Sequence, residues 1–215
     1  MTNRQQAVIV SAVRTPMGSF SGLFSSIPSP RLGSVAIADA LKRIQVTGEQ
    51  IDEVLMGCVL SAGLGQAPAR QASIGAGLRH EVGAVTVNKV CGSSMQTVIM
   101  AARAIALGEA QVIVAGGMEN MTRAPFLLEK ARQGYRLGQG ELTDSLIKDG
   151  LWDVYNQFHM GNAGELCAAR YRFSRQEVDD FALESYSRAR EAITTGSFTR
   201  EIVPVEVPQK KGAPR

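Results

Sequence analysis

The first half of the chain alternates between short apolar runs and longer stretches in which apolar residues recur at helical spacing. The runs whose β-branched content predicts buried strands are residues 7–13, 54–60, 85–90 and 111–117. The stretches between them that predict helices are residues 32–44, 66–76 and 94–107. This alternation predicts an α/β fold with a parallel sheet, on which ligands bind where strands end and helices begin.

The helix predicted over residues 94–107 is apolar on almost every side, with polar breaks chiefly at Gln96, Thr97 and Arg103. A helix of this kind is normally enclosed by protein or spans a membrane, and this one is too short to span. We therefore expect it at the centre of the molecule. Cys91 should then lie at its buried N-terminal end.

The residue composition of the sequence changes near residue 121. We predict a boundary there between a core of residues 1–120 and a second unit of residues 121–215. Residues 123–160 are poor in β-branched runs and carry several glycines. The partial glycine motif at residues 61–68 ends in proline and is not interpreted as a phosphate loop. No internal repeat or low-complexity segment interrupts either unit.

Two helices and one strand are predicted in the second unit. The first helix contains Cys167, which we interpret as a core residue. The second begins at a capping box formed by Ser174 and Glu177, and its apolar stripe predicts a face packed on the core. Residues 201–207 alternate like an edge strand that tolerates a proline.

Composition narrows the class of protein. Of the 215 residues, 45% are hydrophobic and 20% are charged, which is ordinary for a soluble globular protein. The net charge of +3 is spread along the chain without a basic block, so a nucleic-acid partner is not indicated. The start of the chain has no apolar signal region, and no run is long enough to predict a membrane span. We expect a cytoplasmic protein.

The three cysteines, Cys58, Cys91 and Cys167, are far apart and lack the spacing of zinc ligands. Neither a disulfide framework nor a metal site is predicted, and a reducing compartment follows. Cys58 lies inside an apolar run and is interpreted as a buried core residue.

A short helical turn is predicted at the capping box that begins at Thr47.

Cys91 is the candidate nucleophile, because a strand runs into a helix there and the first N–H groups of that helix lack intrahelical partners. The positive end of the helix dipole stabilises a thiolate at this point by about 0.3–1 kcal/mol. That is too little to activate the thiol alone, so a further group is needed. From spacing alone a buried structural cysteine is an equal alternative, since free cysteines are often buried.

The chain offers two histidines as a base. His80 lies in a polar loop and is interpreted as an exposed surface residue. His159 lies between Phe158 and Met160 beside a glycine and is the one that could face a ligand. The residues alone leave its role open.

Three segments in order, Asn88–Ser94, Val114–Met121 and His159–Gly161, resemble the thiolase family of acetyl-CoA C-acetyltransferases and 3-ketoacyl-CoA thiolases. The resemblance extends over essentially the whole chain, including Arg14–Pro16. It implies a layered α/β/α/β/α fold, of which this chain holds the N-terminal core half and part of an inserted loop domain that binds coenzyme A. It also implies coenzyme A thioesters as substrates and no separate cofactor.

The resemblance assigns roles to individual residues. Cys91 accepts the acyl group and its backbone N–H contributes to an oxyanion hole, while Leu151, His159 and Met160 line the tunnel for the pantetheine arm. The strand end at residues 116–117 supports the nucleophile. The His-Met pair resembles the branch that forms acetoacetyl-CoA from two molecules of acetyl-CoA.

Two features depart from the family pattern, and both leave the acyl-chain preference open. Ser94 stands where the family commonly has glycine, and residues 162–166 differ from the usual continuation. The family is also nearly twice as long, and its catalytic histidine, water-holding asparagine and second cysteine come from a C-terminal half that is not in this sequence. We therefore expect this chain to work only with that half. It is expected to be either cleaved after Arg215, at the basic, flexible terminus of residues 210–215, or encoded separately.

Alternative functions remain at this stage. They are a 3-ketoacyl-CoA thiolase of fatty-acid degradation, a ketosynthase relative acting on carrier-protein thioesters, and a non-catalytic module that binds coenzyme A. The resemblance further implies a homodimer or homotetramer.

Overall fold

The computed structural model describes residues 5–209. Its centre is a three-stranded parallel sheet in the order β2-β1-β3, formed by β1 (Glu53–Gly57), β2 (Gly83–Val87) and β3 (Ile113–Gly117). In this register Gly57 pairs with Val87 on one side and with Gly117 on the other, so the three carboxyl ends lie level. A parallel sheet with helical crossovers confirms the predicted α/β class.

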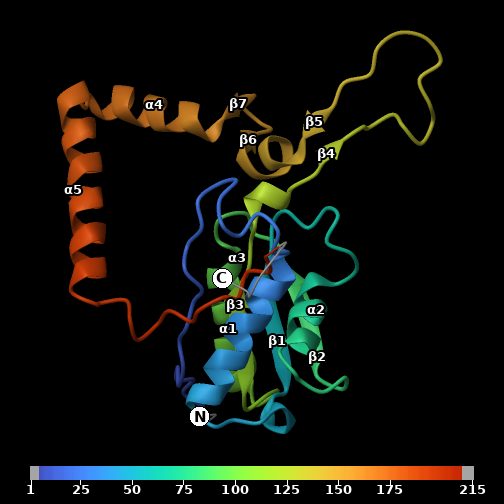
Figure 1. Ribbon diagram of the computed structural model, residues 1–215, viewed down its shortest axis with the longest axis vertical. Helices are drawn as coiled ribbons and strands as arrows, with labels where there is room; N and C mark the ends of the chain where they lie inside the picture. The colour runs from blue at the N-terminus through green and yellow to red at the C-terminus, as the bar shows by residue number, and fades with distance from the viewer. Residues whose placement is uncertain (1–4, 210–215) are drawn as a thin grey trace.

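Helices cover both faces of this sheet. The chain crosses from β1 to β2 through α2 (Pro68–Gly75) and returns past β1 to β3 through α3 (Ser93–Leu107). Since crossovers of this kind are right-handed, the reversal of direction places α2 and α3 on opposite faces. Helix α1 (Ser29–Arg43) packs on α2, as Figure 1 shows. A short helical turn, η1 (Gly48–Gln50), carries the predicted capping box of Thr47 and Gln50.

The core lies between the sheet and the α1–α2 pair. Val54 and Met56 of β1 meet Ile37 of α1 and Ala69 of α2 in one buried cluster that also contains Cys58. Cys58 is 2% exposed, which confirms its predicted place in the core. Four of the five residues of β1 are buried because this central strand has neighbours on both edges and helices on both faces.

After β3 the chain continues as a series of small elements outside this core. The elements are η2 (Met121–Arg123), β4 (Phe126–Leu127), β5 (Thr143–Asp144), the π-helical turn η3 (Leu146–Leu151), β6 (Trp152–Asp153), β7 (Phe158–His159), α4 (Met160–Tyr171) and α5 (Arg175–Thr194). Strands β4 and β5 pair antiparallel, as do β6 and β7. Figure 1 shows α4 and α5 as an arm that stands apart from the sheet.

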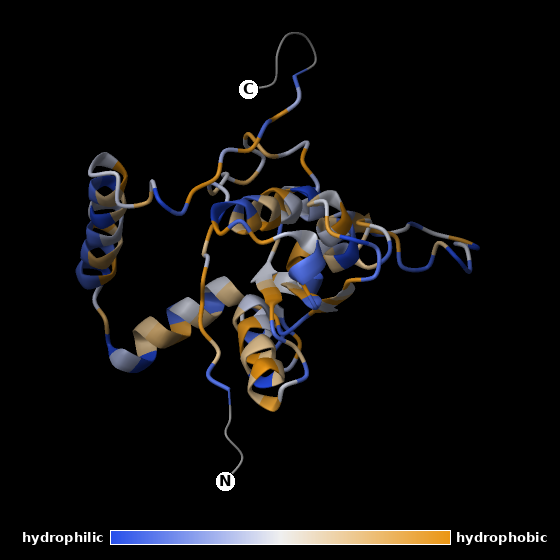
Figure 2. Ribbon diagram, turned by 90° about the horizontal axis from the view of Figure 1, so that it is seen from below, coloured by the Kyte–Doolittle hydropathy of each residue, from blue (hydrophilic) through white to orange (hydrophobic). Residues whose placement is uncertain are grey.

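Helix α5 begins as predicted, because Ser174 accepts a hydrogen bond from the backbone N–H of Glu177 and Glu177 accepts one from the N–H of Ser174. The prediction that its apolar stripe packs on the core is wrong. Phe181 and Tyr186 are each 78% exposed, and the helix is mostly hydrophilic in Figure 2. Cys167 in α4 is likewise exposed rather than buried. Neither helix meets a covering surface within residues 5–209.

The prediction of a buried strand over residues 7–13 is also wrong. These residues form no strand, and Ile9 is 79% exposed. Pairing begins only at Arg14, which forms a single parallel bridge with Ile202. The apolar run finds no strand to pair with and no surface to cover it in the described part of the chain.

Arg14 joins the two ends of the described chain. Its backbone N–H donates to the carbonyl of Glu201 at 2.8 Å, and its guanidinium forms an ion pair with the Glu201 carboxylate at 2.6 Å. The same guanidinium lies 4.9 Å from the centre of the Phe198 ring. Residues 201–207 therefore run beside the N-terminal segment, but as extended chain with one bridge rather than as the predicted edge strand. The predicted flexible terminus, residues 210–215, lies outside the described residues.

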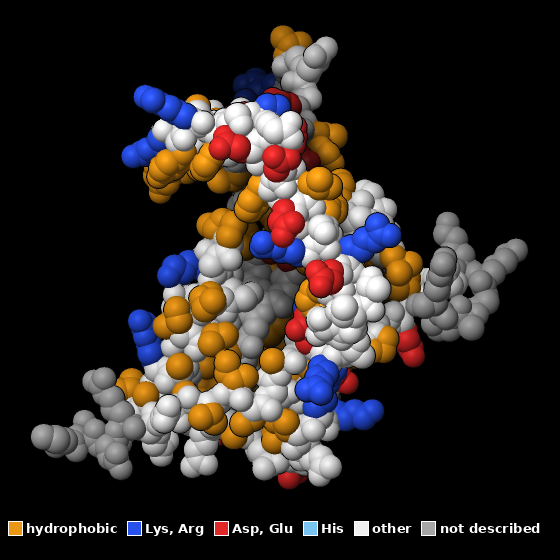
Figure 3. Space-filling model, turned by 90° about the vertical axis from the view of Figure 1, so that its left-hand side faces the viewer, with side chains coloured by type: hydrophobic (Ala, Val, Ile, Leu, Met, Phe, Trp, Pro, Cys, Tyr) orange, Lys and Arg blue, Asp and Glu red, His pale blue; other side chains and the backbone are white. Residues whose placement is uncertain are grey.

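The predicted burial of helix α3 is also wrong. Only Ser93, Thr97 and Ala101 are buried, while Met95 is 65% and Leu107 is 70% exposed. Hydrophobic side chains are visible across one side of the core in Figure 3. The helix covers the sheet with one face and presents its other apolar face to the outside.

The stretch Val90–Leu107 has a mean hydropathy of 1.3 over 18 residues, which by length and composition alone is enough for a membrane span. The helix itself has 15 residues, or about 22 Å, against a hydrocarbon thickness of about 30 Å. Core helices of globular proteins pass the same test of composition, and α3 packs against all three strands of the sheet. We interpret it as a sheet-packing helix.

Candidate active site

The turn between β2 and α3 places Cys91 at the junction that the sequence predicts. Three hydrogen bonds fix this turn. The Asn88 Oδ1 accepts from the N–H of Val90 at 3.0 Å, and the Ser93 Oγ accepts from the N–H of Lys89 at 2.9 Å while donating to the carbonyl of Val90 at 2.6 Å. The backbone before Cys91 is thereby held at three points.

Val90 adopts a strained backbone conformation, with φ of +47°. The left-handed region is sterically unfavourable for a β-branched residue and costs of order 1–3 kcal/mol. Such strain persists only where surrounding bonds impose it, and it is concentrated at functional sites. The strain at Val90 turns the chain sharply and leaves Cys91 exposed at the start of α3. This exposure corrects the expectation that Cys91 lies at a buried helix end.

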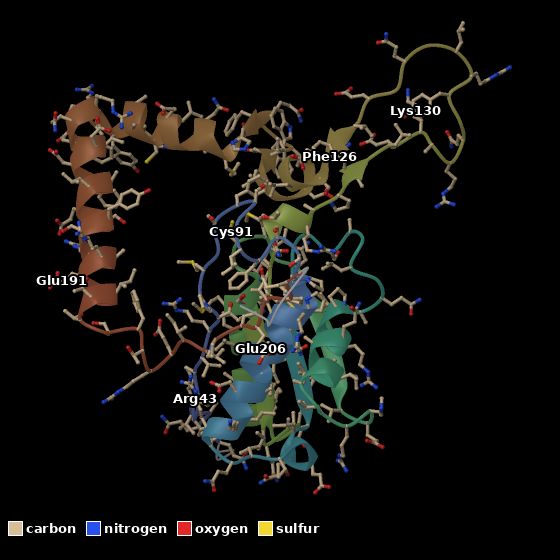
Figure 4. All side chains as sticks on the ribbon, viewed as in Figure 1. Arg43, Cys91, Phe126, Lys130, Glu191 and Glu206 are labelled. Atoms are coloured by element: carbon tan, nitrogen blue, oxygen red, sulfur yellow. The ribbon has the colours of Figure 1, made fainter. Side chains whose placement is uncertain are left out.

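Cys91 lines an open cavity of about 450 Å³. The walls come from the carboxyl ends of β1 and β3, the start of α3 and the end of η3, and Figure 4 shows Cys91 at this end of the core. The lining residues are Gly57, Cys58, Val59, Leu60, Val90, Cys91, Ser93, Ser94, Gly117, Met118, Glu119, Met121, Gly150 and Leu151. A cavity at the carboxyl ends of parallel strands is where ligands bind in this class of fold.

Two glycines allow the start of α3 to approach the sheet. A Cβ atom on Gly57 would lie 2.8 Å from the Cβ of Ser93 and from the backbone N of Ser94. A Cβ atom on Gly117 would lie 1.9 Å from the Oγ of Ser94. The hydroxyl of Thr97 adds a hydrogen bond of 3.0 Å to the carbonyl of Gly116. The end of β3 thus packs directly beneath the turn that carries Cys91.

Among the described residues that line the cavity, Glu119 has the one charged side chain. Its carboxylate accepts the N–H of Val59 at 2.8 Å and the N–H of Leu60 at 3.3 Å, and the thiol of Cys58 donates to it at 3.8 Å. Burial of Cys58, the charge of Glu119 and this hydrogen bond raise the pKa of the Cys58 thiol to about 12. Cys58 is therefore a neutral donor, and Cys91 is the exposed thiol of the cavity.

The structure brings together two of the four residues singled out from the sequence. Leu151 lies in the wall of the cavity that contains Cys91. His159 and Met160 are outside that lining, in β7 and at the start of α4. The Nδ1 of His159 accepts the N–H of Gly161 at 2.9 Å and caps α4, which leaves Nε2 as the donor nitrogen. The predicted contacts of Leu151, His159 and Met160 with a substrate stay predictions.

Sequence reasoning missed two residues of the site. The strain at Val90 has no sequence signal, because valine is a poor residue for that conformation. Glu119 did have one, since it follows a buried strand at the edge of the sheet where ligands bind. Within residues 5–209 no group of three or more His, Cys, Asp or Glu side chains is arranged to hold a metal ion.

Comparison with known proteins agrees with this architecture. The family model described as "Thiolase, N-terminal domain" matches residues 7–215. The chain belongs to the thiolase family. Its three-stranded sheet and α3 are therefore part of a thiolase N-terminal domain, with Cys91 at the sheet-to-helix turn of that domain.

Curated relatives carry the same family relationship across distant organisms. An acetyl-CoA acetyltransferase of Cupriavidus necator is 53% identical over 207 residues, which cover 96% of this chain and 53% of the relative. Acetyl-CoA acetyltransferase 2 of Arabidopsis thaliana is 51% identical over 212 residues, covering 99% of this chain and 53% of the relative. An acetyl-CoA acetyltransferase of Schizosaccharomyces pombe is 51% identical over 209 residues, which cover 97% of this chain and 53% of the relative. The chain spans about half the length of the curated relatives it matches.

Proposed function

We propose that this chain is the nucleophile-bearing half of an acetyl-CoA acetyltransferase, which condenses two molecules of acetyl-CoA to acetoacetyl-CoA and coenzyme A. The observation that carries the proposal is the exposed thiol of Cys91 on a strained turn at a helix N-terminus, in an open cavity of about 450 Å³. Relatives that share half of this sequence by identity bear that name.

The reaction proceeds through an acyl-cysteine. The thiolate of Cys91 attacks the carbonyl carbon of acetyl-CoA, the bond from that carbon to the coenzyme A sulfur breaks, and coenzyme A leaves with the proton that Cys91 lost. A base from the C-terminal half then takes a proton from the methyl group of a second acetyl-CoA and later returns it to the Cys91 thiolate, and the resulting carbanion attacks the acetyl-cysteine. The new carbon–carbon bond forms as Cys91 leaves as a thiolate. Thiolysis of a 3-ketoacyl-CoA is the same sequence in reverse.

The chain supplies part of this machinery. We propose the backbone N–H of Cys91 as a donor that stabilises the negative charge developing on the carbonyl oxygen, because the N–H groups of Gly92 and Ser93 already donate to the carbonyls of Lys89 and Val90. No histidine lines the cavity, so a base must reach Cys91 from another part of the enzyme. We propose the C-terminal half as that part, because the apolar outer face of α3 and the run at residues 7–13 need a cover of this kind.

Further features belong to the same proposal. The pantetheine arm of the substrate runs along Leu151 toward His159 and Met160, and the loop domain begins near residue 121. The assembled enzyme is a cytoplasmic homodimer or homotetramer that needs no cofactor besides its coenzyme A substrates. A thiolase that degrades longer 3-ketoacyl-CoA substrates uses the same nucleophile and differs in the acyl pocket.

A non-catalytic module that binds coenzyme A is the second candidate, and the observation in its favour is that no histidine lines the cavity. Acetylation of Cys91 separates the two functions. The purified chain is incubated with acetyl-CoA, alone and with a separately expressed C-terminal half of a related acetyl-CoA acetyltransferase. Digestion and mass spectrometry then locate any acetyl group.

We expect acetylation of the Cys91 peptide when both halves are present, and none in Cys91→Ser. Cys167→Ser is the matched control, because Cys167 is also an exposed thiol but lies in α4 outside the cavity. It should be acetylated at Cys91 like the wild type. If Cys91 stays unmodified in the presence of both halves, the catalytic proposal is wrong and the binding module remains.

A further inference from the structure

Glu119 stands out because its carboxylate hydrogen-bonds to one wall of the cavity, at Cys58, Val59 and Leu60, and among the described residues it has no hydrogen bond to the turn that carries Cys91. Its two carboxylate oxygens accept the N–H groups of Val59 and Leu60, which follow the end of β1. These amides come directly after the sheet ladder ends, and the carboxylate gives them the acceptor that a further strand would have provided. The path of residues 59–60 therefore depends on one side chain, whereas the N–H of Cys58 donates to the carbonyl of Val87.

The wall held in this way is continuous with the second unit of the protein. Leu60 is 6% exposed, and a Cβ atom on Gly150 would lie 3.3 Å from its Cδ2. The next residue, Leu151, lines the cavity together with Val59 and Leu60. A displacement of Leu60 therefore displaces the Gly150–Leu151 wall as well.

The two residues beside Glu119, Met118 and Asn120, hold its backbone in place through hydrogen bonds. The N–H of Met118 donates to the carbonyl of Gly57 at 2.9 Å, and the Met118 side chain is buried in the core. The Nδ2 of Asn120 donates to the carbonyls of Phe24 and Ile27 at 2.8 and 2.7 Å. A carboxylate carried on so rigid a support holds its partners in one position.

We propose that Glu119 is a positioning residue for acyl transfer. It acts through Val59 and Leu60 to hold the wall against which the thioester is oriented toward Cys91. The inference rests on the proposed function, because it concerns the same thioester. Cys91 itself is held separately, through Asn88 and Ser93, so its intrinsic reactivity does not depend on Glu119.

The test compares two reactions of the same thiol. Acetylation by acetyl-CoA, with the C-terminal half of a relative present, needs the wall, whereas alkylation by iodoacetamide needs only an accessible thiol. Glu119→Gln keeps the size of the side chain but has one acceptor oxygen and no charge. It therefore cannot accept from Val59, Leu60 and the Cys58 thiol in the way that the two carboxylate oxygens do. We expect kcat/KM for acetylation to fall ~10- to 100-fold, with alkylation of Cys91 within about twofold of the wild type.

Two further variants make the test specific. Glu119→Asp keeps both oxygens and should restore part of the loss. Gly150→Ala leaves Glu119 intact, but its new Cβ would lie 3.3 Å from the Cδ2 of Leu60 and push that side chain. It should also slow acetylation without slowing alkylation. Glu49→Gln, the same change at an exposed position in η1, is the control and should change neither rate.

The outcomes are distinguishable. A selective loss of acetylation in Glu119→Gln and Gly150→Ala supports the inference. Unchanged acetylation in both variants overturns it, and so does an equal loss of acetylation and alkylation, which would show a general loss of structure. If the wild-type chain is not acetylated at all, the proposed function is wrong and this inference goes with it.

Discussion

The close packing of Gly57 against α3 leads to a prediction that can be worked from distances. In Gly57→Ala the new Cβ would lie 2.8 Å from three atoms of Ser93 and Ser94, two of them backbone atoms, none of which is the end of a flexible side chain. The strand and the helix must separate by roughly 0.6 Å to bring 2.8 Å to the 3.4 Å at which ordinary contact begins. Overpacking of this kind costs about 1–3 kcal/mol.

The expected result has two parts. For a chain of this size each 1 kcal/mol lowers Tm by about 2–4 °C, which thermal unfolding followed by circular dichroism detects. The start of α3 carries Cys91, so the same shift should slow acetylation of Cys91, by up to about tenfold, given that a 1 Å misplacement costs about a hundredfold. Both changes follow from one contact.

The matched control is Gly83→Ala at the start of β2. There the nearest atom to a new Cβ is the Cγ of Glu53 at 4.0 Å, so the same methyl group meets no obstruction. The reasoning is refuted if Gly57→Ala unfolds at the same temperature as Gly83→Ala and is acetylated at the same rate.

Three other predictions concern α4, α5 and Cys58. Gly164→Ala should stabilise α4 by about 0.5–1 kcal/mol, read from helix content on heating, because a Cβ there meets nothing within 4 Å. Ser174→Ala should cost α5 about 1 kcal/mol and speed hydrogen exchange at the Glu177 amide, whereas Ser187→Ala inside the same helix should not. The raised pKa of Cys58 contributes stability that is fully present below the unfolded value of 9.0 and is lost as the pH rises toward 12. Urea unfolding at pH 8 and 10.5 should therefore show a loss of up to about 1.4 kcal/mol per pH unit that Cys58→Ala lacks.

Features set by neighbouring residues were predictable from the sequence. The capping boxes at Thr47 and Ser174 form as expected because each needs only residues three apart. The place of Cys91 at a strand-to-helix turn was predictable for the same reason. Apolar periodicity also gave α3 within one residue at its start.

Features that depend on distant surfaces were not predictable. The contact of Glu119 with Val59 joins residues 60 positions apart, which no local pattern encodes. The apolar character of α3 predicted a helix enclosed on every side, but the described residues cover it on one face only. The left-handed backbone at Val90 is imposed by Asn88 and Ser93 against the preference of valine itself.

The pairing of Arg14 with residues 201–203 sets an order of events during synthesis. The two partners are 187 positions apart, so the ribosome must add that many residues after Arg14 before the N-terminal segment can be anchored. Val207, which packs on Ile27 and Leu32, emerges later still. At about 5–20 residues per second the apolar run at residues 7–13 stays without this anchor for roughly ten seconds or more. The nascent chain is therefore a natural client for a chaperone at the tunnel exit, and its yield should respond to translation speed.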